Sequence, residues 1–147
     1  MNSGYAIAGF DVKDVAPDHK TDYVNQILTK LYPEQTLQPN GMRALGAWGW
    51  GVSRIIDYFE TDKDIDASKV IVVGHSRGGK AALWCGAQDR RVAIAVSNES
   101  GNSGAKISRR MVSRSSRLKQ SYIRVTSARL ASRALPLLIS VSLFRSE

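Results

Sequence analysis

The chain has 147 residues, of which 43% are hydrophobic and 23% charged, proportions that are ordinary for a soluble globular protein with one modest domain. Its single cysteine excludes an internal disulfide, and two histidines with one thiol are too few for a metal site built from such ligands. The N-terminus lacks the pattern of a signal peptide, and the longest apolar run, residues 134–144, is too short to span a bilayer. We therefore expect neither a metal nor a membrane among its partners.

The net charge of +8 comes entirely from the end of the chain. Residues 1–105 hold 11 basic and 12 acidic side chains, whereas residues 106–147 hold 10 basic side chains and one acidic side chain. Because the body of the chain is nearly neutral, a nucleic-acid partner is not expected for it. A basic tail that binds nucleic acid or another acidic surface remains an alternative function.

Three short apolar runs predict buried parallel strands, because they lack the polar alternation of a half-exposed strand. They cover residues 4–12, 69–74 and 91–98. The apolar spacing between and after them predicts helices. We expect a short helix over residues 23–31 that Pro33 ends, a longer amphipathic helix over 45–59, a polar connection at 61–69 and a helix over 79–88. The order β-α-α-β-α-β predicts an α/β fold with right-handed crossovers and a parallel sheet.

The last part of the chain differs abruptly in composition from the rest. Residues 106–147 contain no glycine and no aspartate, and serine and arginine make up 18 of these 42 residues. The segment shows no alternation of strands and helices, so we expect it to add no strand to the sheet. We predict a domain fragment over residues 1–105 and, over 106–147, a basic Ser/Arg-rich tail outside the ancestral domain. A shifted reading frame would produce such a break, and a disordered basic extension is the alternative.

The stretch 70-VIVVGHSRGGKAALWCGA-87 places a serine between an apolar strand and an alanine-rich helix. The pattern G-x-S-x-G sets such a serine on a tight turn, where small neighbours let the backbone fold sharply and expose Oγ. This context predicts Ser76 as a nucleophile. The alternative is a serine that caps the helix of a dinucleotide-binding or flavodoxin-type unit.

Three charged residues near this turn are candidates for the same site. Arg77 follows the serine and could stabilise an oxyanion together with backbone N–H groups at the start of the helix. Lys80 lies one helical turn further on, and Glu99 follows the third predicted strand, where functional side chains of parallel sheets gather. For each of them an ordinary role stays open, which is a surface ion pair for Arg77, a solvated helix position for Lys80 and a turn cap for Glu99.

The general base is the missing part of this predicted site. His75 adjoins Ser76 on the turn, so its ring is expected to project away from Oγ. His19 lies early in the chain, after the first predicted strand, whereas the histidine of such sites usually comes late. We therefore identify no histidine base in the sequence.

At these residues the chain resembles the bacterial branch of the glucuronoyl esterases, carbohydrate esterases also described as 4-O-methyl-glucuronoyl methylesterase-like or acetyl xylan esterase-like. The combination of G-x-S-R-x-G-K with a downstream N-E-S-G is far more specific than the serine turn alone. The resemblance implies a partial α/β-hydrolase fold, a parallel sheet fragment with flanking helices. The matching stretches are 45-LGAWGWGVSRIIDYFETDKDID-66, 72-VVGHSRGGKAALWCGAQDRR-91 and 94-IAVSNESG-101.

The resemblance also implies a role for each candidate. Ser76 matches the nucleophile, Arg77 the arginine that helps to bind the oxyanion, Lys80 the lysine that contacts the uronate sugar and Glu99 the acid. The family's histidine lies beyond the point where this chain loses the pattern. Members of the family are usually secreted or periplasmic, whereas the chain itself leaves the location open.

These features predict a serine carboxylic ester hydrolase of glucuronoyl, or acetyl, esters in xylan-type plant polysaccharide. Such an acyl transfer through a serine ester needs no cofactor. We expect impaired activity because a catalytic histidine is missing. The alternatives are a catalytically dead fragment, a binder that acts through the basic tail, and another α/β-hydrolase of dienelactone-hydrolase-like or peptidase-like type.

Overall fold

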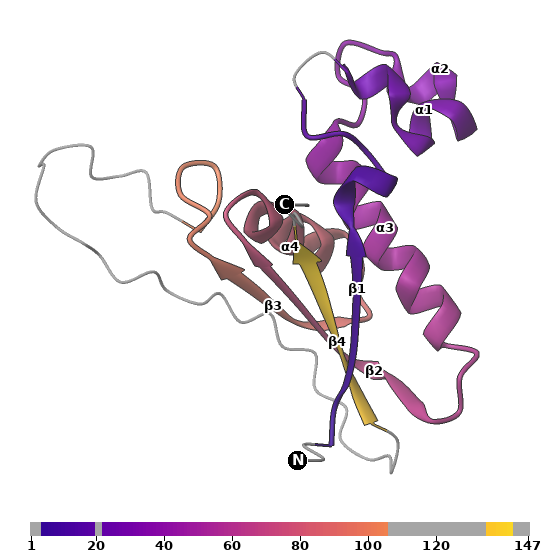
Figure 1. Ribbon diagram of the computed structural model, residues 1–147, viewed down its shortest axis with the longest axis vertical. Coiled ribbons are helices and arrows are strands. Elements are labelled where there is room, and N and C mark those ends of the chain that lie inside the picture. Colours follow the sequence, from indigo (N-terminus) through magenta and orange to yellow (C-terminus); the bar gives the residue numbers. More distant parts are fainter. Residues whose placement is uncertain (1–3, 20–21, 106–134, 143–147) are drawn as a thin grey trace, which may run out of the picture.

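A computed structural model describes residues 4–19, 22–105 and 135–142 of the chain (Figure 1). Within these residues the centre is a four-stranded parallel sheet with the order β1-β4-β2-β3. The predicted α/β class with a parallel sheet is therefore confirmed. The strands are β1 (Ala6–Asp11), β2 (Ile65–His75), β3 (Val92–Asn98) and β4 (Leu135–Ser142).

The helices follow the predicted order. Pro33 ends the first helical pattern and also begins a further short helix, because a proline at the first helical position lacks only an N–H that would have no partner within the helix. The helical segments are η1 (Val12–Asp14), η2 (Asp22–Asn25), α1 (Ile27–Leu31), α2 (Pro33–Thr36), α3 (Ala44–Phe59) and α4 (Arg77–Gln88).

One predicted connection is partly a strand. The sequence predicts a polar connection over residues 61–69, whereas β2 begins at Ile65. Asp66 is only 7% exposed, but its carboxylate is satisfied locally, since it accepts from the Ser68 N–H at 3.1 Å and pairs with Lys69 Nζ at 2.9 Å. This local pairing lets polar residues occupy the start of a strand.

The expectation that no strand follows residue 105 is wrong for Leu135–Ser142. This segment forms β4, which lies between β1 and β2 and pairs in parallel with both of them (Figure 1). Ile139 and Val141 are fully buried there, at 0% exposure. The partners of β4 lie more than sixty residues away in the sequence, so local patterns do not predict the pairing. The division at residue 105 remains a prediction, and residues 106–134 lie outside the described residues.

Among the described residues, one face of the sheet is buried and the other is more exposed. Residues paired across parallel strands point to the same side of a sheet. The row that starts at Ala8 continues through Ile139, Val72 and Ala95, and these last three are fully buried. The adjacent row starts at Ile7, which is 75% exposed. The core of the described chain therefore lies on one side of the sheet.

Helices α3 and α4 both cover this buried face. Gly51 on α3 lies against Phe10, and Gly86 on α4 lies against Ala95, residues that point to the same side of the sheet. Trp48 is fully buried, and its Nε1 donates to the Ala16 carbonyl at 2.9 Å. This bond ties α3 to the chain that follows β1.

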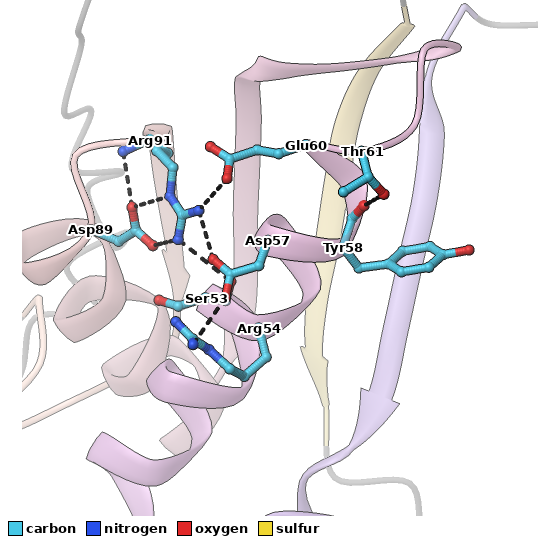
Figure 2. Close-up of polar contacts among 8 residues, drawn as sticks. All are labelled: Ser53, Arg54, Asp57, Tyr58, Glu60, Thr61, Asp89 and Arg91. Atoms are coloured by element: carbon cyan, nitrogen blue, oxygen red, sulfur yellow. Dashed lines mark hydrogen bonds and ion pairs between the residues drawn. The ribbon is translucent and has the colours of Figure 1, made fainter.

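An arginine-centred cluster joins α3 to the start of β3 (Figure 2). Arg91 donates to both carboxylate oxygens of Asp89, with Nε–Oδ1 at 2.9 Å and Nη2–Oδ2 at 2.7 Å. Its Nη1 also contacts Asp57 at 2.7 Å and Glu60 at 2.9 Å, both near the end of α3. The Arg91 guanidinium lowers the pKa of Asp89 to about 2. This cluster lies at the N-terminal end of β3, opposite to the carboxyl ends of the strands.

Candidate active site

Ser76 makes the turn from β2 to α4 by itself. β2 ends at His75 and α4 begins at Arg77, and the Ser76 backbone has φ 52° and ψ −115°. This conformation lies outside the regions that L-residues favour, so it stores backbone strain. The Ser76 side chain is exposed and makes no hydrogen bond that caps α4. The geometry therefore argues against a capping role for this exposed serine.

Three glycines make this sharp turn possible. A Cβ on Gly74 would overlap the carbonyl of Gly78, and a Cβ on Gly78 would overlap the carbonyl of Val141 on β4. A Cβ on Gly79 would lie 2.9 Å from Ser97 Oγ and 3.0 Å from the Asn98 carbonyl. The small residues of the motif are therefore required by close backbone packing, as the motif predicts.

The serine turn is fixed to the end of the neighbouring strand β3. The Ser76 N–H donates to the Asn98 carbonyl at 2.8 Å, and the Asn98 side-chain amide lies 3.2 Å from His75 Nδ1. Asn98 thus holds the backbone of Ser76 and the ring of His75. Glu99 follows directly, with φ 48° and an exposed side chain. Ser76 and Glu99 therefore lie at the same edge of the sheet.

Arg77 reaches across the end of β4 to the loop after β1. Its Nη1 forms an ion pair with Asp18 Oδ1, with the Arg77 side chain 50% exposed and that of Asp18 22% exposed. Within the described residues, this carboxylate oxygen receives no well-aligned hydrogen bond. The Arg77 guanidinium is therefore held mainly by its charge, beside an Asp18 oxygen that accepts no well-aligned hydrogen bond from the described residues.

Lys80 and His19 complete the set of predicted candidates. The Lys80 N–H donates to the Ser76 carbonyl at 3.3 Å, which places Lys80 in the first turn of α4. Its side chain is half-buried. His19 is exposed and adjoins Asp18, so the loop that carries it reaches the Arg77 side of the turn.

The structure gathers Ser76, Arg77, Lys80 and Glu99 at the carboxyl ends of β2 and β3. Asp18 is a member of this region that the sequence patterns do not predict. An acidic residue shortly after a parallel strand is a signal that could have suggested it. In the part of the chain that the structure describes, no hydrogen bond joins His75 to Ser76. The predicted lack of a base stays a prediction.

The described residues also form a cavity that the serine turn does not line. This cavity of about 390 Å³ lies between α1, α2 and the start of α3, and its lining, which includes Tyr32 and Trp50, contains no residue of the serine turn. The described residues include no group of His, Cys, Asp and Glu side chains that could hold a metal ion. None of the described helices is long and apolar enough to cross a membrane.

A parallel sheet with a strained, exposed serine between a strand and a helix is the arrangement of an α/β-hydrolase nucleophile turn. Solved structures share this fold. A glucuronoyl esterase from Solibacter usitatus matches with a TM-score of 0.60 and 46% identity, covering 66% of this chain and 25% of that chain. A carbohydrate esterase family 15 glucuronoyl esterase from Caldicellulosiruptor kristjansonii matches with a TM-score of 0.58 and 42% identity, covering 65% of this chain and 25% of that chain.

The chain belongs to the glucuronoyl esterase family, because the family model described as glucuronyl esterase of fungi matches residues 1–134. Carbohydrate esterase MZ0003, from an unknown prokaryotic organism, is 46% identical over 109 residues, which are 73% of this chain and 25% of that protein. The 4-O-methyl-glucuronoyl methylesterase 1 of Wolfiporia cocos is 51% identical over 63 residues, which are 42% of this chain and 15% of that protein. The predicted family and the α/β-hydrolase fold are confirmed. The chain spans a quarter or less of the length of these relatives.

Proposed function

We propose that this chain carries the nucleophile half of a glucuronoyl esterase site, with Ser76 as the nucleophile. The observation that supports this most directly is the Ser76 conformation, φ 52° and ψ −115°, with an exposed side chain that caps nothing. Strain of this kind is typical of catalytic turns. The names of the relatives suggest the substrate class, an ester of a 4-O-methyl-glucuronoyl group.

The proposed reaction is a two-step acyl transfer. Ser76 Oγ attacks the carbonyl of the glucuronoyl ester, its proton passes to a base, and the alcohol leaves with a proton from that base. Water then attacks the acyl-serine and releases the uronic acid. The Arg77 guanidinium and the N–H groups at the start of α4 would stabilise the oxyanion, because both place positive charge beside it.

Lys80 and Glu99 have supporting roles in this proposal. The ammonium of Lys80, one helical turn after the serine, would bind the sugar of the uronate. The carboxylate of Glu99 would orient a histidine base. We propose impaired activity, because His75 Nδ1 faces the Asn98 amide and because His19 lies early in the chain, whereas the histidine of such sites usually comes late.

Imidazole rescue tests this proposal. The purified chain and its Ser76→Ala variant are incubated with benzyl glucuronate ester, with and without added imidazole, and product release is measured by chromatography. Without imidazole we expect hydrolysis near the background, since losing one triad member removes several orders of magnitude in rate. With imidazole we expect a rate at least about tenfold above that of Ser76→Ala, since imidazole replaces the base.

A Ser103→Ala variant is the matched control, because Ser103 is an exposed serine at the same edge of the sheet. It should behave as the unchanged chain does. Full hydrolysis without imidazole would contradict impairment but not the nucleophile. Equal rates for the chain and Ser76→Ala at every imidazole concentration would contradict Ser76 as the nucleophile.

A further inference from the structure

The two strands that flank β4 follow each other in the described fold but are not neighbours. The chain leaves β1, passes through α3 and returns as β2, and this crossover skips one strand position. Consecutive parallel strands are usually neighbours, so the skipped position is a built feature of this fold. Both of its edges present backbone N–H and C=O groups that need a strand between them.

β4 fills this position with hydrogen-bonded neighbours on both sides. It pairs with β1 without interruption from Ala6↔Leu137 to Asp11↔Ser142, and with β2 from Ile71↔Leu138 to Gly74↔Val141. Ile139 and Val141 point toward the helix layer and are fully buried. The position therefore demands apolar side chains at these two alternate places.

The start of β4 fits its position less well than the rest. Between the pairs Asp66↔Pro136 and Ile71↔Leu138, β2 advances by five residues while β4 advances by two. Pro136 has no N–H to donate and is unusual within an inner strand. β4 therefore begins with a proline and a register break, although it is a central strand. Its start fits the position between β1 and β2 poorly.

β4 lies outside the family match, whereas the strands on both sides of its position lie within it. The family match covers β1, α3 and β2 and ends at residue 134, directly before β4. Three quarters of carbohydrate esterase MZ0003 lie outside its alignment with this chain, which is ample chain to provide a strand of its own. We propose that the position between β1 and β2 is a strand-acceptor site, and that Leu135–Ser142 fills it as an exchangeable occupant. Exchange of this strand concerns assembly of the sheet and does not depend on the proposed function.

Peptide exchange in a cut chain tests this proposal. A specific protease site is inserted in the segment 106–134, and the intact, folded chain is purified and then cut. The cut chain is unfolded in urea and refolded with excess isotope-labelled peptide of residues 135–147. We expect one labelled peptide per chain by native mass spectrometry. Hydrogen exchange should show that the amides of Ala6–Asp11 are protected only when a peptide is bound, because among the described strands β1 pairs with β4 alone, whereas β2 also pairs with β3.

Two peptide variants distinguish specific binding at this position from nonspecific binding. A peptide with Val141→Asp should bind at least about tenfold more weakly, because it would bury an unpaired charge. A peptide with Ser140→Asp carries the same charge one residue earlier, on the half-buried side, and should lose much less. The proposal is overturned by equal binding of the two variants, by no incorporation of the labelled peptide after refolding, or by protection of Ala6–Asp11 without bound peptide.

Discussion

Arg77 and Asp18 form an ion pair that connects the start of α4 with the loop after β1. The strands that precede these two elements, β2 and β1, flank β4, so the pair bridges the carboxyl end of that strand. Arg77 is the residue that we propose for oxyanion binding, and in this structure its charge is directed at a carboxylate. Asp18 therefore competes with any anion that would approach the serine turn.

We predict that Asp18→Asn raises the imidazole-assisted hydrolysis rate, because Arg77 loses its competing anion. The ion pair is partly exposed, so its loss should lower the free energy of unfolding by less than about 1 kcal/mol, measured by urea titration. Asp14→Asn is the matched control, since Asp14 is an exposed carboxylate in η1, before the same loop. A lower rate in Asp18→Asn would show that Asp18 positions Arg77 and does not compete with the substrate.

Replacing Ser76 by glycine should stabilise the chain relative to alanine. Both variants remove the hydroxyl, but only glycine adopts φ 52° and ψ −115° without strain. The expected difference in the free energy of unfolding is about 1–2 kcal/mol in favour of Ser76→Gly. Urea unfolding followed by circular dichroism measures it. Equal stability of the two variants would argue against a strained turn in solution.

Gly78→Ala should strongly destabilise the chain, because the new Cβ would overlap the Val141 carbonyl. The Val141 backbone is held by strand pairs on both sides, and we expect a loss of about 2–4 kcal/mol or failure to fold. Gly9→Ala is the control, since its Cβ would meet its nearest neighbour at an ordinary 3.8 Å. Thermal melting of both variants checks this, and similar melting temperatures would contradict the close packing of α4 on β4.

The Arg91 cluster should make stability depend on pH below 4. The pKa of Asp89 is lowered from 3.8 to about 2, first by its hydrogen bonds to the Arg91 side chain. A lowered pKa stabilises the fold above the unfolded-state value, so this contribution is complete above about pH 4 and is lost as the pH falls through 2. Urea titrations between pH 5 and pH 2 should show the decline.

Arg91→Ala should remove that part of the pH dependence and about 1–3 kcal/mol of stability at pH 7, because it leaves Asp89, Asp57 and Glu60 without their shared donor. Arg90→Ala is the control, since Arg90 is exposed and adjacent in the sequence. If the free energy of unfolding depends on pH in the same way in both variants, the cluster does not govern the loss of stability at acid pH.

Cys85 should be unreactive in the folded chain. It is 2% exposed, and burial, aided by the nearby Asp89 charge, raises the pKa of its thiol to about 11. The thiolate is the reactive form, so alkylation at pH 8 should be slow until the helix layer opens. Mass spectrometry of iodoacetamide labelling, with and without urea, measures this. Rapid labelling in native buffer would contradict the packing of α4 against α3.

The sequence predicts the serine turn well because its determinants are local. Gly74, Ser76 and Gly78 are close in the chain, and a single strand and helix complete their surroundings. The candidates Arg77, Lys80 and Glu99 follow from position alone, since parallel strands end at a common edge. Their gathering there is a property of the fold class.

The features that the sequence does not predict depend on contacts between residues that are distant in the sequence. Asp18 meets Arg77 only because β1 and β2 are two positions apart in the sheet. β4 can be identified as a strand only from its pairing with β1 and β2. Its own sequence does not predict a strand, because it contains Pro136 and follows a Ser/Arg-rich stretch. Nothing in the local pattern of either segment identifies its partner.

The close approach of Gly78 to the Val141 carbonyl connects the serine turn directly with β4. The backbone that presents Ser76 is supported from beneath by a segment outside the family match, at residues 135–142. Damage to that segment would therefore act directly on the backbone that presents Ser76.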